Sequence, residues 1–153
     1  MKPTGQDLLK QAKKSLGDEY IYGANVDISD PEWLGPWDCA EFCTWVVYQV
    51  VKKVFGCIDN NAPMEDLEPY TGGWRQDVRR GAVKQITVAK AAKTPGAILL
   101  RYRQGGKHIV FSGGDGTTIE AKNEYYGVCR GKVGNLSSWD YGILIPGVDY
   151  GLD

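Results

Sequence analysis

The sequence predicts an α+β fold, in which N-terminal helices pack on an antiparallel β-sheet, and two observations carry this prediction. Residues 38–55 contain apolar side chains at the spacing of a largely buried helix. After Pro95, short apolar stretches alternate with glycine-containing turns, which is typical of strands joined by tight connections. Helices come first and strands second, with no repeat or linker between them. We therefore expect a single domain over residues 1–153.

The other elements follow from the same two patterns. Residues 6–16 place leucine and alanine side chains at helical spacing, and Gly17 follows as a helix stop. Residues 20–23 form a short β-like segment, and residues 25–35 form a polar loop. A further helix is predicted over residues 71–81. The predicted strands are residues 97–102, 108–112, 117–121, 125–132 and 141–145, with a turn at residues 104–106.

The composition excludes several classes of protein. Hydrophobic residues make up 42% and charged residues 24% of the 153-residue chain, which is typical of a globular domain. A net charge of −1 without a basic stripe argues against nucleic-acid binding. No apolar run approaches the ~20 residues that span a bilayer. We expect a monomer. The N-terminus lacks an apolar signal-peptide core, so localisation stays open. Export would need lysis, a dedicated secretion system or a leader already removed.

Cys39 lies where the predicted central helix begins. Asp38 is a favoured N-cap residue, and Glu41 completes a capping-box pattern in which Asp replaces the usual Ser or Thr. Cys39 then falls on the first helical turn, where free backbone N–H groups and the helix dipole favour a thiolate. Such surroundings can lower a cysteine pKa from about 8.5 to roughly 3.5–7.5. We interpret Cys39 as a candidate nucleophile.

The other cysteines do not indicate chemistry. Cys43, Cys57 and Cys129 are expected to be small buried hydrophobes. Two disulfides are possible in principle, but a chain of this length does not need them as a framework. A single histidine and the helical spacing of Cys39 and Cys43 make a poor metal-ligand set. We expect no metal and no cofactor.

His108 is the only histidine, so any imidazole base must be this residue. If residues 113–115 form a three-residue loop, Glu120 lies directly opposite His108, with Cβ atoms about 4.5–5.5 Å apart. Glu120 would then accept a hydrogen bond from one ring N–H while the other nitrogen faces a thiol. A loop of two or four residues would place the two side chains on opposite faces, and Glu120 would then be an exposed strand carboxylate. The alternative for His108 is a structural histidine.

Five motifs in this order resemble the NlpC-type cell-wall cysteine peptidases. They are Tyr-x-aromatic-Gly at residues 20–23, Asp38-Cys39, Pro95-Gly96, His108, and the polar Glu120 twelve residues after the histidine. The chain departs from the family pattern at four positions. These are Ala40 in place of serine, Glu41 in place of glycine, Ala97 in place of aspartate, and Glu120 where the family commonly has His, Asn or Gln.

The resemblance implies a papain-like fold and cleavage of peptide bonds in peptidoglycan stem peptides, usually the γ-D-glutamyl bond to a diamino acid. Cys39 would attack the carbonyl, His108 would transfer the proton, and Glu120 would orient the imidazole ring. Tyr20 would help bind the substrate or stabilise the oxyanion, and Asp38 matches a residue that contacts a substrate amine in some relatives. Ala40 removes a serine linked to amine recognition, so the substrate preference stays open.

The tryptophans admit two interpretations. Trp33, Trp37 and Trp74 either line a substrate cleft, with Trp37 as our candidate substrate contact, or belong to the core. Two alternatives to the peptidase also stay open. One is a module of the same fold that lost turnover and binds the wall or serves as structure. The other is a cysteine amidase or acyltransferase with another substrate.

Overall fold

The computed structural model describes residues 1–103 and 106–152, so the turn predicted at residues 104–106 lies largely outside the described residues. The helices of the described part are α1 (Gly5–Lys13), α2 (Cys39–Val51), α3 (Thr71–Arg79) and α4 (Val88–Ala92), with short 3-10 turns at η1 (Met64–Asp66) and η2 (Leu136–Ser138). The strands are β1 (Lys84–Ile86), β2 (Ile98–Arg101), β3 (His108–Ser112), β4 (Thr117–Asn123), β5 (Gly127–Lys132) and β6 (Tyr141–Leu144).

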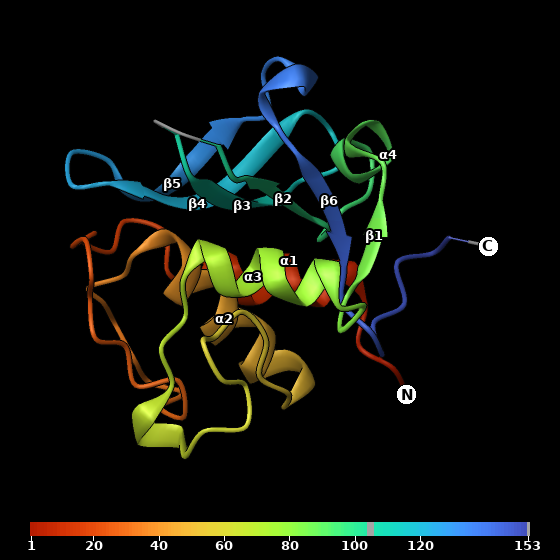
Figure 1. The fold of residues 1–153 in the computed structure, drawn as a ribbon. Coiled ribbons are helices and arrows are strands. Elements are labelled where there is room, and N and C mark those ends of the chain that lie inside the picture. The colour runs from red at the N-terminus through yellow and green to blue at the C-terminus, as the bar shows by residue number, and fades with distance from the viewer. Residues whose placement is uncertain (104–105, 153) are drawn as a thin grey trace.

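The strands form one sheet in the order β1-β6-β2-β3-β4-β5, and neighbouring strands are antiparallel. Helices α1, α2 and α3 lie below the sheet in Figure 1, and α4 lies on the opposite side, beside β6 and β2. The α+β prediction is confirmed. Neither β1 nor α4 was predicted. Among the described helices, none has the length and hydropathy to cross a membrane.

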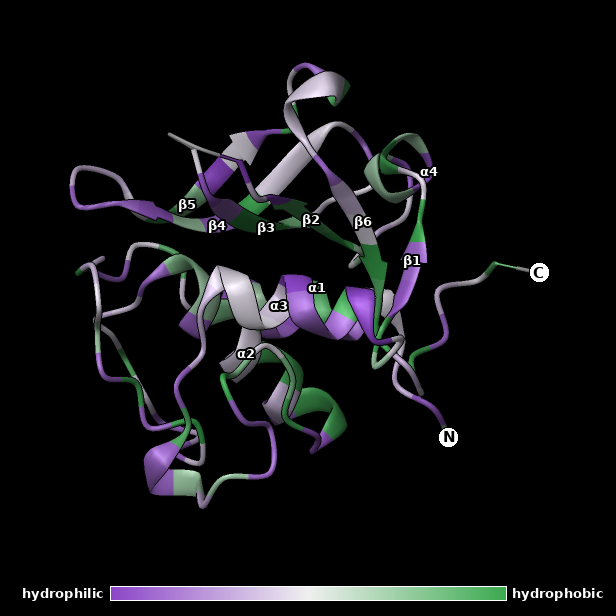
Figure 2. Cartoon of the chain, viewed as in Figure 1, coloured by the Kyte–Doolittle hydropathy of each residue, from purple (hydrophilic) through white to green (hydrophobic). Residues whose placement is uncertain are grey.

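The sheet separates two apolar clusters. Ile109 and Phe111 of β3 face the helices below, where the Phe111 ring meets Phe42 of α2 edge to face at 6.0 Å. The intervening Val110 packs on the other side with Leu99, because successive strand side chains point to opposite faces. Figure 2 shows hydrophobic residues concentrated on α2 and on the middle strands of the sheet. The larger cluster thus fixes α2, and with it Cys39, against β3.

Side chains cap the first two helices, although only one has the expected arrangement. Thr4 and Asp7 form a full capping box at α1, with bonds of 3.2 and 2.8 Å. At α2, Asp38 Oδ1 accepts from the backbone N–H of Glu41 at 2.8 Å, which confirms the predicted cap. The capping box also predicts that the Glu41 side chain accepts from the backbone N–H of Asp38, and this prediction is wrong. The Glu41 side chain turns inward and accepts from the N–H of Val26 at 3.4 Å.

Candidate active site

Cys39 is the first residue of α2 and is partly exposed. The backbone N–H of Ile109, the residue after His108, is among the groups that interact with its sulfur. The start of α2 therefore lies against the start of β3, which is the arrangement that the predicted pairing of a thiol with His108 needs. Burial, followed by the nearby charge of Asp38, raises the pKa of Cys39 to about 12. The expected low thiol pKa is wrong for this structure, because those two effects outweigh the N–H groups at the helix start.

His108 and Glu120 are in direct contact: Nε2 of the imidazole lies 3.0 Å from Oε1 of the carboxylate. The predicted register is wrong by two residues, since Phe111 pairs with Ile119 and Ser112 with Thr118. Glu120 therefore lies opposite Val110 and is the diagonal neighbour of His108. A shift of two residues keeps both side chains on the same face of the sheet, so the predicted contact is present despite the wrong register.

The surroundings of Glu120 hold it as a carboxylate. Burial works to raise the pKa of Glu120, but hydrogen bonds from His108 and from the Thr118 hydroxyl lower it below its ordinary value. Gly131 on β5 leaves the necessary space, because a Cβ there would lie 2.5 Å from Oε2 of Glu120. Sequence reasoning missed both roles: Thr118 contacts Glu120 as its neighbour two residues away on the same face of β4, whereas the role of Gly131 is defined only by the pairing of β4 with β5.

An ionised Glu120 accepts hydrogen bonds, so Nε2 of His108 carries the proton in this contact. The other ring nitrogen, Nδ1, is then an acceptor that can take a proton from a thiol. The indole of Trp139 lies beside the imidazole, with ring centroids 6.3 Å apart. The His108–Glu120 pair is thus partly shielded from water, and its geometry suits a general base with a fixed tautomer.

Tyr20 and Asp38 lie around the thiol. Burial raises the pKa of Tyr20 well above its ordinary value, and the neighbouring charges of Cys39 and Asp38 raise it further. The backbone brings these residues together, since Tyr20 and Trp37 form a β-bridge in which Ile21 donates to the Trp37 carbonyl at 2.9 Å. The Tyr20 phenol therefore stays protonated and can donate a hydrogen bond next to Cys39.

Comparison with solved structures identifies the architecture. The NlpC/p60 domain of the peptidoglycan hydrolase SagA matches with a TM-score of 0.62 at 22% identity, over 93% of this chain and 99% of that chain. This chain has the NlpC/p60 fold. The p60 domain of an antigen from M. avium subspecies paratuberculosis matches with a TM-score of 0.63 at 15% identity, over 94% of each chain. For the peptidoglycan hydrolase RipB of Mycobacterium tuberculosis, the TM-score is 0.63 at 16% identity, over 92% of this chain and 64% of that one.

No protein-family model matches the sequence, and the search of curated proteins finds no match. At these identities the likeness to solved structures establishes the fold. The papain-like NlpC/p60 fold is the one that the sequence resemblance implied, so that expectation is confirmed. The roles of individual residues are separate questions that depend on the geometry of this chain.

Trp37 is not exposed at the protein surface in this NlpC/p60 fold. Its side chain is completely buried, and its ring packs edge to face against Phe42 at 5.3 Å and Trp45 at 4.8 Å. Its indole N–H donates to Asp18 at 3.0 Å. The prediction that Trp37 binds substrate is therefore wrong, because the residue supports the α2 N-terminus from inside the core. Trp74 is also completely buried.

Glu41 is a buried carboxyl that sequence reasoning assigned only to a cap. The residue is 7% exposed, and its Oε2 atom has no hydrogen-bond partner among the described residues. Burial, followed by the charge of Asp38, raises the pKa of Glu41 to about 8. The Asp38 carboxylate accepts a hydrogen bond from the backbone N–H of Glu41, which favours its charged form. Glu41 is therefore the carboxyl group of this pair that holds a proton at neutral pH.

Glu41→Gln is expected to make thermal stability less sensitive to pH. In the unfolded chain Glu41 ionises near its ordinary 4.5, but in the folded chain near 8. Between these values the folded state binds more protons, so the contribution of Glu41 to stability falls as pH rises. Wild-type Tm should drop by several degrees more than that of Glu41→Gln between pH 5 and 8, since 1 kcal/mol corresponds to ~2–4 °C at this size. Calorimetry measures this, with Glu124→Gln on the surface as control. Parallel Tm curves would show that Glu41 is already ionised.

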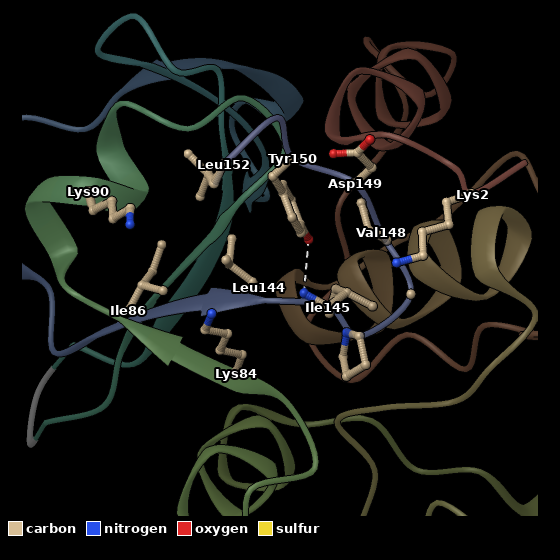
Figure 3. A pocket seen from close by; sticks show the side chains of 12 residues that line it. Lys2, Lys84, Ile86, Lys90, Leu144, Ile145, Val148, Asp149, Tyr150 and Leu152 are labelled. Carbon is tan, nitrogen blue, oxygen red and sulfur yellow. Dashed lines mark hydrogen bonds between the residues drawn. The ribbon is translucent and has the colours of Figure 1, made fainter.

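A pocket formed by other residues lies away from Cys39. It has a volume of about 600 Å³ and is bounded by β1, β6 and the C-terminal segment, with Lys84 and Lys90 on its wall (Figure 3). Tyr150 crosses it and accepts a hydrogen bond from the N–H of Ile145 at 2.9 Å. None of the residues that resemble the peptidase motifs lines this pocket.

The remaining thiols are free. Cys43 and Cys57 are buried, as predicted, whereas Cys129 is partly exposed on β5, opposite Glu120. Within residues 1–103 and 106–152, no cluster of three or more His, Cys, Asp or Glu side chains could hold a metal ion.

Proposed function

We propose that residues 1–153 form a single catalytic domain that hydrolyses amide bonds in bacterial cell-wall stem peptides, with the γ-D-glutamyl bond to a diamino acid as the expected target. The contact between His108 Nε2 and Glu120 Oε1 at 3.0 Å carries this proposal. It leaves Nδ1 as the proton acceptor next to the strand position that meets Cys39. The NlpC/p60 fold, which SagA and RipB share, supports peptidoglycan as the substrate and the cell wall as the place of action.

The reaction follows from these positions. Because burial keeps the resting thiol protonated, the proton passes from Cys39 to Nδ1 of His108 as the sulfur attacks the substrate carbonyl. The Cys39 backbone N–H and the Tyr20 hydroxyl stabilise the oxyanion that forms. The tetrahedral intermediate collapses to a thioester, and His108 gives its proton to the departing amine. Water then adds to the thioester with His108 as base, which releases the acid and restores the thiol.

Digestion of purified peptidoglycan tests the proposal. We expect mass spectrometry of the muropeptides to show new fragments that begin with the free amine of the diamino acid. Protein treated beforehand with iodoacetamide, with modification of Cys39 verified by peptide mapping, is the control and should release none. A free amine on the first alanine instead would identify an amidase that removes the stem peptide from the sugar.

One observation favours the inactive module as a second candidate, namely the raised pKa of Cys39. This candidate predicts no new amines in the digest. It also predicts that iodoacetamide at pH 6 modifies Cys39 as slowly as Cys43, Cys57 and Cys129. The peptidase predicts that Cys39 reacts much faster than these three thiols, because His108 can accept its proton.

A further inference from the structure

A second pocket, of about 330 Å³, opens directly beside the His108–Glu120 pair. Its wall contains four cationic side chains, which are Arg101, Lys107, Lys122 and Lys132. They come from the end of β2, the residue before β3, and strands β4 and β5. The chain as a whole carries a net charge of −1, so this concentration of positive charge is local.

None of the four cations forms an ion pair within the described part of the chain, although Lys122 lies near enough to Glu120 to help lower its pKa. The ion pairs there are Arg80–Asp77, Arg103–Asp140 and His108–Glu120, and none of them includes a cation of this pocket. Three of the cations lie instead over aromatic rings, which leave their charge intact: Lys107 over Tyr102, Lys122 over Tyr126 and Arg101 over Trp139.

Glu120 is the one carboxylate among the residues that line this pocket. Both of its oxygens already accept hydrogen bonds, from His108 and from Thr118. The Nε–H group of Arg101 already donates to the Gly106 carbonyl, whereas the three lysine side chains form no ion pair among the described residues. The pocket therefore carries an excess of positive charge that can bind an anion.

The chemistry of the proposed reaction fixes which half of the substrate meets this pocket. His108 protonates the departing amine, so the leaving half of the peptide lies on the His108 side of the scissile bond. The acyl half lies on the side of Tyr20 and Asp38, which are neighbours of Cys39. The cationic pocket includes His108 and excludes Tyr20 and Asp38, which places it on the leaving-group side.

We propose that the pocket formed by Arg101, Lys107, Lys122 and Lys132 binds a free carboxylate on the leaving half of the stem peptide. This inference rests on the proposed function and specifies its substrate: a peptide whose amine-side fragment is anionic. Amidation of that carboxylate would remove the charge that the pocket binds, so the protein would distinguish amidated from unamidated cell-wall peptides.

A matched pair of substrates tests the proposal. L-Ala-γ-D-Glu-L-Lys-D-Ala and its C-terminal amide differ by one carboxylate on the leaving half. We expect wild-type kcat/KM to favour the free acid by about tenfold, mainly through KM, since a few exposed charge pairs each contribute a small factor. The double variant Lys122→Gln/Lys132→Gln should reduce this preference to within about twofold. Lys84→Gln/Lys90→Gln makes the same change of charge at the distant pocket and should retain the full preference.

Equal kcat/KM for the acid and the amide, or a preference that survives in Lys122→Gln/Lys132→Gln, would overturn the proposal. If neither substrate is cleaved, the proposed function fails instead, and a binding measurement decides this inference separately. The imidazole proton signal of His108 is unique in the NMR spectrum, because the chain has one histidine. Titration with L-Lys-D-Ala should shift it more than titration with the amide, and the double variant should abolish the difference. Equal shifts for both dipeptides would reject the pocket as a carboxylate site.

Discussion

Replacement of Cys39 by alanine is expected to lower kcat/KM for stem-peptide cleavage by about 10⁴-fold or more, because no other group can form the thioester. The fold should survive the change. Cys39 is partly exposed, and alanine is a better helix former than cysteine at a position whose cap, Asp38, stays in place. Release of the peptide fragment, followed by chromatography, measures the rate. The melting temperature of the variant, within a few degrees of the wild type, verifies folding.

Cys43→Ala is the matched control for this experiment. Its thiol lies one helical turn further along α2 and is completely buried, so it cannot reach a substrate. We expect Cys43→Ala to cost some stability through the small cavity it leaves, while kcat/KM stays within a few-fold of the wild type. Substantial turnover by Cys39→Ala, in a preparation free of contaminating hydrolases, would contradict the thiol mechanism.

The parts of the site that the sequence predicts are those set by local rules. An N-cap residue followed by a buried apolar stripe locates the start of α2, so the position of Cys39 needs no tertiary information. The placement of His108 and Glu120 on the same face of the sheet depends only on whether the loop between the paired strands has an odd or an even number of residues. For this reason the contact was predicted although the register was wrong by two residues.

The parts that were wrong depend on packing between distant segments. Glu41 has the sequence of a capping box, but contact with the loop at Val26 turns its carboxyl into the interior. Trp37 precedes the helix start and looks like a groove residue, yet Phe42 and Trp45 enclose it. The thiol pKa was predicted from the helix dipole and the free N–H groups of the first turn, whereas burial and Asp38 dominate it.

The cationic pocket has no sequence signal at all. Its four charged residues belong to separate segments that become neighbours only through the order of β2, β3, β4 and β5 in the sheet. A composition that is neutral overall hides such a cluster, because net charge sums over the whole surface. Its detection requires the register of the strands, which is the quantity that a single sequence determines least well.

Replacement of His108 by alanine is expected to lower kcat/KM by about 10³- to 10⁴-fold, since both the proton acceptor for Cys39 and the donor for the leaving amine are lost. Added imidazole should restore part of the rate by occupying the space beside Glu120. Loss of the ring also leaves the buried Glu120 carboxylate with one partner fewer, so some loss of Tm is expected. Initial rates with and without imidazole, at one pH, measure the effect.

Glu120→Gln separates two contributions of Glu120, the orientation of the His108 ring and the negative charge beside it. The amide oxygen of glutamine can also accept the hydrogen bond from Nε2–H of His108, so the ring keeps its orientation and Nδ1 its acceptor role. The Thr118 hydroxyl can still form a hydrogen bond with the glutamine amide at the position of Oε2. We therefore expect a loss of no more than about tenfold, well short of the effect of His108→Ala, since the removed charge acts only through the imidazolium. If Glu120→Gln were as inactive as His108→Ala, orientation of the ring would not suffice, and the negative charge of Glu120 would itself be required for proton transfer.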